Sequence, residues 1–306
     1  GIGILFPFAD SDEDRDTMMN TVAPVWDGNE TWLVLGGGGL LVSFPVVYAV
    51  ALSAFYIPVI AMLIALAFRG VAFEFRFKAD RSRPLWDWGF FFGSLLASFF
   101  QGVILGAFIR GVAVEGTTFA GGVLDWLSWF SVFTGLAVAV GYTLLGATWL
   151  VLKTEGPLQD WAWRLVRPLT VGLIAGIVIV SIWTPLVDQA IAQRWFSTPN
   201  IFYLSPVPII TAILVLWLWR AETRGAELQP FVLTLALFLL SFAGFAISIW
   251  PNVLPPDVSL WEAAAAPSTQ MFMLIGVIIF LPLVLGYTAY SYFVFRGKVR
   301  PGEGYH

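Results

Sequence analysis

The sequence contains no cysteine, a single histidine and few charged residues, and these shortages exclude several kinds of protein. Without cysteine there is no disulfide, no thiolate-ligated haem and no cysteine-ligated iron–sulfur cluster. The only histidine, His306, is the last residue of the chain. Haem and transition metals usually take imidazole from a helix inside a fold, whereas chain termini are commonly disordered. We therefore expect no metal site and no haem in this chain.

Charge is also scarce. Charged residues make up 12% of the 306 residues, apolar residues make up 58%, and the mean hydropathy is +0.82. An ordinary soluble domain is about one quarter charged, because its surface must be solvated. The 15 tryptophans and 8 tyrosines suit the boundary between lipid and water. No basic patch points to a nucleic-acid partner, and the composition predicts an integral membrane protein.

Charge-free runs locate the membrane spans, each of which needs about 20 apolar residues. The run Thr31–Phe68 is too long for one helix, so we expect two antiparallel helices that meet at a tight turn near Tyr48–Ser53. Six further runs predict one span each, which makes eight complete transmembrane helices: Trp88–Ile109, Trp126–Leu152, Pro168–Val187, Trp195–Trp219, Leu228–Pro256 and Ala263–Phe295.

The first eight residues, GIGILFPF, are apolar but too short to cross a bilayer. We expect them to be the end of a truncated first helix, which gives nine helices in the native chain. No internal repeat and no long polar stretch divides the sequence. The prediction is a single all-α, polytopic membrane domain over residues 1–306.

The basic residues predict the orientation. With nine spans, 14 of the 16 Lys and Arg residues follow helices one, three, five, seven and nine, and only Arg110 and Arg194 lie on the other side. Cytoplasmic loops of membrane proteins carry the excess of Lys and Arg. The first group of segments, and with it the C-terminus, is therefore expected in the cytoplasm.

Asp27 and Glu30 are the carboxylates nearest to a span, at the expected cytoplasmic mouth of the second helix. One interpretation is structural: Asp27 or Asn29 caps the helix, and Glu30 sits in the favourable first turn. The other is a proton or ion path, since ionisable groups near membrane depth are often functional. The two roles are compatible.

The run Gly36–Gly39 lies inside the same helix. Glycine weakens a helix but lets another backbone or a ligand approach closely, and we expect helix packing here. The run is not a phosphate loop, because the lysine of that motif is absent. No residue stands out as catalytic.

Several longer stretches resemble one family. They are MMNTVAPVWDGNETW at residues 18–32, which runs on into LVLGGGG, LKTEGPLQDWA at residues 152–162, PSTQMFM at residues 267–273, and GYTAYSYFVFRGKVRPGEGYH at residues 286–306. Together they resemble subunit II of the bacterial cytochrome bd-type quinol oxidases, especially the cyanide-insensitive branch. The likeness covers essentially the whole chain.

The resemblance implies a heterodimer in the bacterial cytoplasmic membrane. Subunit I would hold two b haems and one d haem, oxidise quinol and reduce dioxygen to water with cytoplasmic protons, contributing to proton-motive force in aerobic respiration. Subunit II would have no redox centre of its own; it would support subunit I and form part of the proton path, and in some members an oxygen route or a bound quinone. A small accessory single-helix subunit is a further expected partner.

The resemblance also assigns roles to residues. Asp27 matches the proton-path carboxylate of the family's WDG motif, and Trp32 matches the tryptophan at the mouth of the proposed oxygen route. Trp26 neighbours both. An Asp-Gly-Phe-Asp motif in the family's first helix would lie before Gly1, so its carboxylates have no counterpart here.

Two other classes remain as alternatives. A membrane transporter or permease usually places a carboxylate or broken helices at the membrane midplane, and the long runs here lack such a charge. A purely structural assembly subunit differs from a proton-conducting one chiefly at Asp27.

The scarcity of haem ligands makes a direct prediction. Expressed alone and purified, this chain should show no haem absorbance, whereas co-expression with a larger partner should give b- and d-type bands. Absorbance spectra of the two preparations check this, and a stoichiometric haem spectrum from the isolated chain would contradict it.

Overall fold

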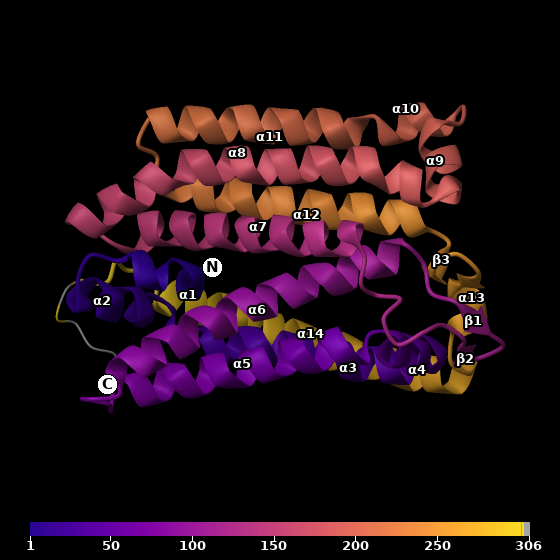
Figure 1. Ribbon diagram of the computed structural model, residues 1–306, viewed down its shortest axis with the longest axis horizontal. Coiled ribbons are helices and arrows are strands. Elements are labelled where there is room, and N and C mark those ends of the chain that lie inside the picture. Colours follow the sequence, from indigo (N-terminus) through magenta and orange to yellow (C-terminus); the bar gives the residue numbers. More distant parts are fainter. Residues whose placement is uncertain (301, 303–306) are drawn as a thin grey trace.

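The computed structural model describes residues 1–300 and 302, so His306 lies outside the described residues. The described chain is almost entirely helical. Seven segments are long and apolar enough to cross a membrane: α5 (Tyr56–Arg76), α6 (Arg83–Ile109), α7 (Trp129–Lys153), α8 (Gly156–Val187), α10 and α11 together (Asn200–Leu204, Pro206–Thr223), α12 (Leu228–Ile249) and α14 (Pro267–Val294). They lie roughly side by side (Figure 1). The expected all-α, polytopic membrane fold is confirmed.

Shorter elements join these helices. They are α1 (Ile2–Leu5), η1 (Phe6–Phe8), α2 (Asp12–Val22), α3 (Trp26–Ser43), α4 (Pro45–Ala54), α9 (Gln189–Phe196), α13 (Leu260–Ala263) and four short strands, β1 (Val114–Glu115), β2 (Thr118–Phe119), β3 (Asn252–Leu254) and β4 (Val258–Ser259). The strands form two antiparallel pairs, β1 with β2 and β3 with β4.

The long run 31–68 folds differently from the expectation. The tight turn expected near Tyr48–Ser53 is wrong, because those residues are helical within α4. The chain breaks instead at Phe44 and Phe55, on either side of α4. Pro45 explains the first break, since proline has no N–H and clashes with a preceding helical turn. The first of the eight expected spans thus corresponds to α3 and α4 together. Helix α3 is not among the seven apolar segments, because its first two turns contain several polar residues.

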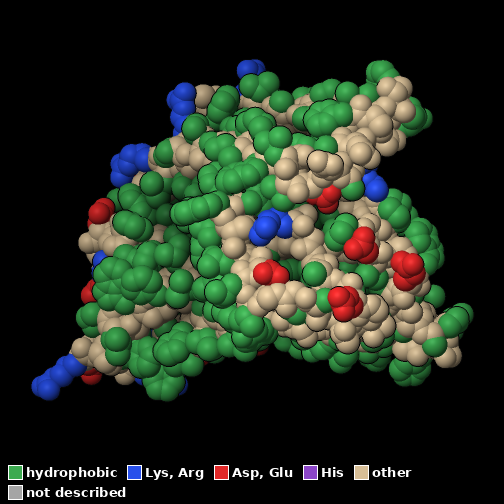
Figure 2. Space-filling model, turned by 45° about the vertical axis from the view of Figure 1, so that its right-hand side comes forward, with side chains coloured by type: hydrophobic (Ala, Val, Ile, Leu, Met, Phe, Trp, Pro, Cys, Tyr) green, Lys and Arg blue, Asp and Glu red, His purple; other side chains and the backbone are tan. Residues whose placement is uncertain are grey.

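Basic residues gather at one end of the bundle, as the alternation of spans requires. Arg76 ends α5, Arg83 begins α6 and Lys153 ends α7; we call this the basic end. The opposite end carries β1–β4, α9 and α13 (Figure 1). Figure 2 turns this opposite end toward the viewer and shows more acidic than basic side chains there. Placing the basic end in the cytoplasm remains a prediction.

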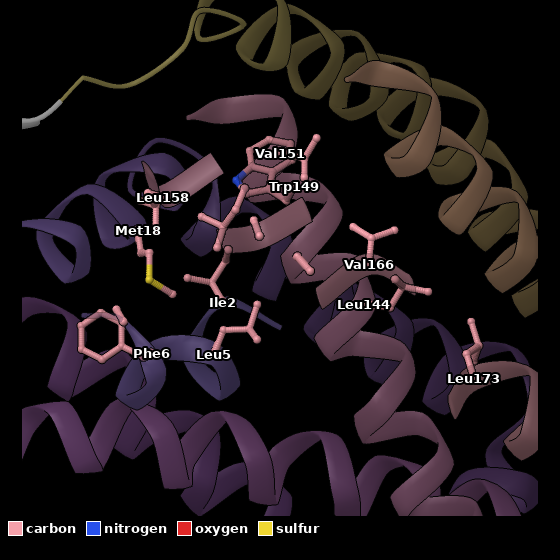
Figure 3. Close-up of a cluster of buried hydrophobic side chains, with 14 of the residues drawn as sticks. Ile2, Leu5, Phe6, Met18, Leu144, Trp149, Val151, Leu158, Val166 and Leu173 are labelled. Atoms are coloured by element: carbon pink, nitrogen blue, oxygen red, sulfur yellow. The ribbon is translucent and has the colours of Figure 1, made fainter. Parts of the chain in front are cut away.

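Small residues allow the central helices α6 and α7 to approach closely. A Cβ atom added at Gly102 would lie 2.7 Å from the Cα atom of Gly135, and one added at Gly106 would lie 2.7 Å from the Cα atom of Ser131. Close backbone approach of this kind replaces the hydrophobic driving force that is absent between helices in lipid. The first eight residues pack beside these helices: Figure 3 shows Ile2 and Leu5 in one apolar cluster with Leu144.

A fully buried arginine ties the basic end together. Arg76 has no exposed side-chain surface. Its Nε atom lies 2.5 Å from an oxygen of Asp87 on α6, and its NH1 group pairs with Asp16 of α2. The guanidinium carbon also lies 4.9 Å from the ring centre of Phe6. Arg83 pairs with the same oxygen of Asp16. These side chains, which we call the Arg76 cluster, join η1, α2, α5 and α6.

The surroundings of Asp16 set its protonation. Burial alone raises the pKa of this carboxyl, but hydrogen bonds from Arg83 and Arg76 outweigh burial and bring the pKa below its usual range. Asp16 is therefore ionised at neutral pH, where it compensates the buried charge of Arg76.

The segment after α14 is bound by Lys153 of α7 and by Glu227 next to α12. Lys153 of α7 donates hydrogen bonds from Nζ to the carbonyl oxygens of Phe295 and Gly297, the latter at 3.0 Å. The Nζ atom of Lys298 lies 2.8 Å from Glu227, next to α12, and Gln159 of α8 donates to the same oxygen. The hydrogen bond from Lys298 is the main reason that the pKa of Glu227 is lowered. We call these contacts the C-terminal clasp.

The Arg76 cluster predicts a pH-dependent loss of stability. Asp16→Asn should lower the free energy of unfolding at pH 7 by about 1–2 kcal/mol, less than a fully buried pair because Asp16 is 38% exposed. Because the folded-state pKa is lowered, the stabilisation by Asp16 is present above the unfolded value of about 4 and is lost as pH falls through the folded value.

Thermal unfolding in detergent at pH 7 and at lower pH measures this effect. The matched control is Asp160→Asn, an exposed carboxylate on α8 at the same end that forms no ion pair with the described residues. If the difference in unfolding temperature between wild type and Asp16→Asn stays constant from pH 7 to strongly acidic conditions, the carboxylate charge of Asp16 does not cause the loss of stability.

Candidate functional site

The candidate residues lie at the start of α3, beside α5. Trp26 is the first residue of α3 and packs on Phe73 of α5, with ring centres 5.1 Å apart. Gly70 leaves room for this indole, because a Cβ there would lie 3.5 Å from Trp26. Trp26 is half-buried and anchors the end of α3 to α5.

The expected capping arrangement is wrong. The N-cap position is Val25, whose side chain makes no capping hydrogen bond, and Asp27 lies within the first turn. Glu30 lies further along, outside the first turn. A carboxylate at the position of Asp27 still interacts favourably with the positive end of the helix dipole.

Asp27 and Glu30 have different environments. Asp27 is exposed and forms no hydrogen bond or ion pair with the described residues. Glu30 pairs with Arg69 of α5, and both side chains are about 70% buried, with exposed fractions of 29% and 27%. This ion pair joins α3 to α5. Asp27 is therefore available to bind a proton or another chain, whereas Glu30 is already engaged.

The glycine run lies on an open surface. A Cβ atom added at Gly36, Gly37 or Gly38 would meet no described atom within 4 Å, and one at Gly39 would lie 3.5 Å from the Cε atom of Met273. Only Gly39 thus approaches another helix of this chain, α14. Trp32 is half-buried and lies on α3 between Asp27 and the glycines.

Helices α3 and α14 lie against each other and leave their outer sides uncovered. Asn29 donates a hydrogen bond from Nδ2 to the Tyr292 hydroxyl at 3.0 Å, and Gln270 donates to the carbonyl oxygen of Ser43 at 2.6 Å. Neither helix has a buried residue. We call their uncovered surface the α3–α14 face; its exposed apolar side chains include Leu33, Val34, Leu35, Met271, Phe272, Ile279 and Leu283.

The sequence alone did not identify the Arg76 cluster as part of this end. A cavity of about 560 Å³ lies beside it, lined by Asp12, Arg15, Asp80, Arg83 and Asp87 among others. The available signal was Arg76 and Asp87 themselves, charged residues at the adjoining ends of two apolar helices. Among the described residues, no group of three or more acidic, histidine or cysteine side chains is arranged to hold a metal ion.

The arrangement of the helices is similar to that of a solved structure. The bd oxidase from Geobacillus thermodenitrificans aligns with a TM-score of 0.73 over 96% of this chain and 92% of the other, at 17% sequence identity. At that identity, the likeness concerns the fold.

Curated relatives match along nearly the whole chain. The cytochrome bd ubiquinol oxidase subunit 2 of Bacillus subtilis is 30% identical over 99% of this chain and 91% of its own length. The cytochrome bd-I ubiquinol oxidase subunit 2 of Escherichia coli K12 is 28% identical over 98% of this chain and 89% of its own length.

The family comparison agrees with these likenesses. Residues 1–295 match the family model described as cytochrome bd terminal oxidase subunit II. The match extends from the first apolar residues through α14, and so includes Asp27, the glycine run and the α3–α14 face. The chain belongs to the cytochrome bd terminal oxidase subunit II family.

Proposed function

We propose that this chain is the haem-free subunit II of a quinol:O₂ oxidoreductase in the bacterial cytoplasmic membrane. It would support a haem-bearing subunit I, which carries two b haems and one d haem, and supply part of the path for protons consumed in reducing O₂ to water. The observation that carries the proposal is the family match over residues 1–295. Family membership makes the chain part of an oxidoreductase complex; the division of labour between subunits is the proposal.

The α3–α14 face is the proposed contact with subunit I. Glycine inside a helix destabilises it by about 1 kcal/mol relative to alanine. Within this chain, Gly36, Gly37 and Gly38 bring no compensating close contact, because a Cβ at each would meet open space. A helix from a partner subunit, packed directly on the exposed backbone, accounts for all three.

Asp27 is the proposed proton-binding group at the margin of this contact. It lies at the basic end, which the positive-inside rule places in the cytoplasm. It is exposed and pairs with none of the described residues, so its carboxyl group can exchange protons with water. Glu30, in contrast, is held by Arg69, which favours a structural role. Trp32 retains its proposed role at an oxygen route, while Trp26 positions the start of α3.

A bound quinone and a small accessory single-helix subunit complete the proposal as further partners. Both follow from the family resemblance, and neither has an assigned contact in this chain.

The interface proposal is tested by filling the glycine surface. Gly37→Leu should reduce co-purification of subunit I by at least about tenfold, since the added side chain prevents close helix approach. The unfolding temperature of this chain purified alone should change little, because the added side chain meets open space.

The control is Ala212→Leu, an exposed small residue on α11 across the bundle from α3 (Figure 1). It adds similar bulk and should leave co-purification unchanged. Equal recovery of subunit I with both variants would exclude the α3–α14 face as the contact.

The role of Asp27 is tested by Asp27→Asn, which preserves the shape of the side chain and removes its titratable group. Assembly and haem content should persist, since only a favourable helix-dipole interaction of about 0.3–1 kcal/mol is lost. Quinol oxidase turnover and coupled acidification should fall by about tenfold or more if proton transfer limits the variant.

Asp160→Asn, an exposed carboxylate at the same end, serves as the matched control and should have normal turnover. Full activity and normal acidification in an assembled Asp27→Asn complex would reduce Asp27 to a structural residue and favour an assembly role for the subunit.

A further inference from the structure

A groove at the opposite end of the bundle combines one cationic side chain with an apolar floor. Its volume is about 370 Å³, and it lies between α9, α10 and the end of α12. Polar side chains at its rim are Arg194, Asn200 and Tyr203, joined by Trp250; Leu204 and Ile247 supply apolar surface. We call it the α9–α12 groove.

Helix α9 is fixed in place on both sides of Arg194. Asp188 accepts a hydrogen bond from the backbone N–H of Ala190 at 2.8 Å and begins the helix. Ile191 is 3% exposed and packs in an apolar cluster with Ile109 and Phe130. Trp195 donates from Nε1 to the hydroxyl of Ser248 on α12 at 2.9 Å. These contacts on both sides of Arg194 fix the part of α9 that presents Arg194 to the groove.

Among the described residues, none compensates the charge of Arg194. It forms no hydrogen bond or ion pair with the described residues, although it is half-buried. Arg110, the other basic residue at this end, donates to the carbonyl oxygen of Asp125 at 3.3 Å. Asp188, the N-cap of α9, lies six residues before Arg194, about 9 Å along the helix axis. Its carboxylate accepts hydrogen bonds from the backbone N–H groups of Ala190 and Ile191.

The position of the groove at the ends of three spans indicates the level of the lipid headgroups. Span α8 ends at Val187, the span formed by α10 and α11 begins at Asn200, and α12 ends at Ile249, so three span ends surround it. Tyr203 and Trp250 are exposed there, which is typical of residues at the lipid–water boundary. Leu204 and Ile247 continue the surface toward the hydrocarbon region.

We propose that the α9–α12 groove binds one phospholipid molecule through its phosphodiester. Arg194 supplies the positive charge and a forked set of N–H donors that matches phosphate oxygens. Asn200 uses one N–H on Ser197, at 3.1 Å, and keeps a second for the ligand. The Tyr203 hydroxyl is a further donor, and an acyl chain runs along Leu204 and Ile247. This inference needs only the membrane spans and is independent of the proposed oxidase role.

The test is native mass spectrometry of the full chain, in its purified complex where one forms, titrated with dioleoylphosphatidylglycerol in mild detergent. Arg194→Gln should weaken binding of one lipid by about tenfold, as expected from losing a charge-assisted hydrogen bond. Arg194→Lys should fall between the glutamine variant and wild type. Arg110→Gln, at the same end, is the control and should bind lipid like wild type.

Three results would overturn the proposal. Equal lipid binding by wild type and Arg194→Gln would mean that Arg194 only complements the carbonyl end of α12. Displacement of the lipid by inorganic phosphate alone would identify a site for a free anion instead of a lipid. Tyr203→Phe removes one hydroxyl at an exposed position; if Arg194→Gln does not fold, unchanged lipid affinity in this second variant also overturns the proposal.

Discussion

The pairing of one fully buried guanidinium organises the basic end of this protein. In a chain with so little charge, Arg76 must be compensated where it lies, because an uncompensated buried charge destabilises a fold by several kcal/mol. Its partners come from α2 and α6, and the ring of Phe6 covers it. Fixing α5 in this way also fixes Phe73, on which Trp26 and the start of α3 rest. The position of Asp27 therefore depends indirectly on Arg76.

Glycine has two different uses in this fold. At Gly102 and Gly106 it lets α6 and α7 of the same chain touch, and any larger side chain would collide with backbone atoms. At Gly36–Gly38 it leaves α3 bare. The contrast separates the closed part of the bundle, which is packed within the subunit, from an open part that we propose is covered by a second chain.

The spans were largely predictable because they depend on local composition. Charge-free runs located each of the six spans from α6 onward but not the short helices α9 and α13, and the alternation of basic segments agreed with the directions of the spans. The break at Phe44 was missed, since the run Thr31–Phe68 was divided by span length, which put the turn near Tyr48–Ser53 instead of before Pro45. The ion pairs Arg76–Asp16 and Glu30–Arg69 join residues far apart in sequence, so no local pattern indicated them. Likewise, the sequence placed Asp27 near a helix start but gave no sign that Val25 is the N-cap or that Asp27 pairs with none of the described residues.

The C-terminal clasp has a consequence for the order of biosynthesis. Helix α14 buries no residue along its length, and the clasp at its end depends on residues 295–299 reaching Lys153 and Glu227. Ribosomes make this segment after every other described span. The α14 half of the α3–α14 face is therefore synthesised long after α3. Under the proposed function, a second subunit would find this face complete only after α14 and the segment of the clasp have been made.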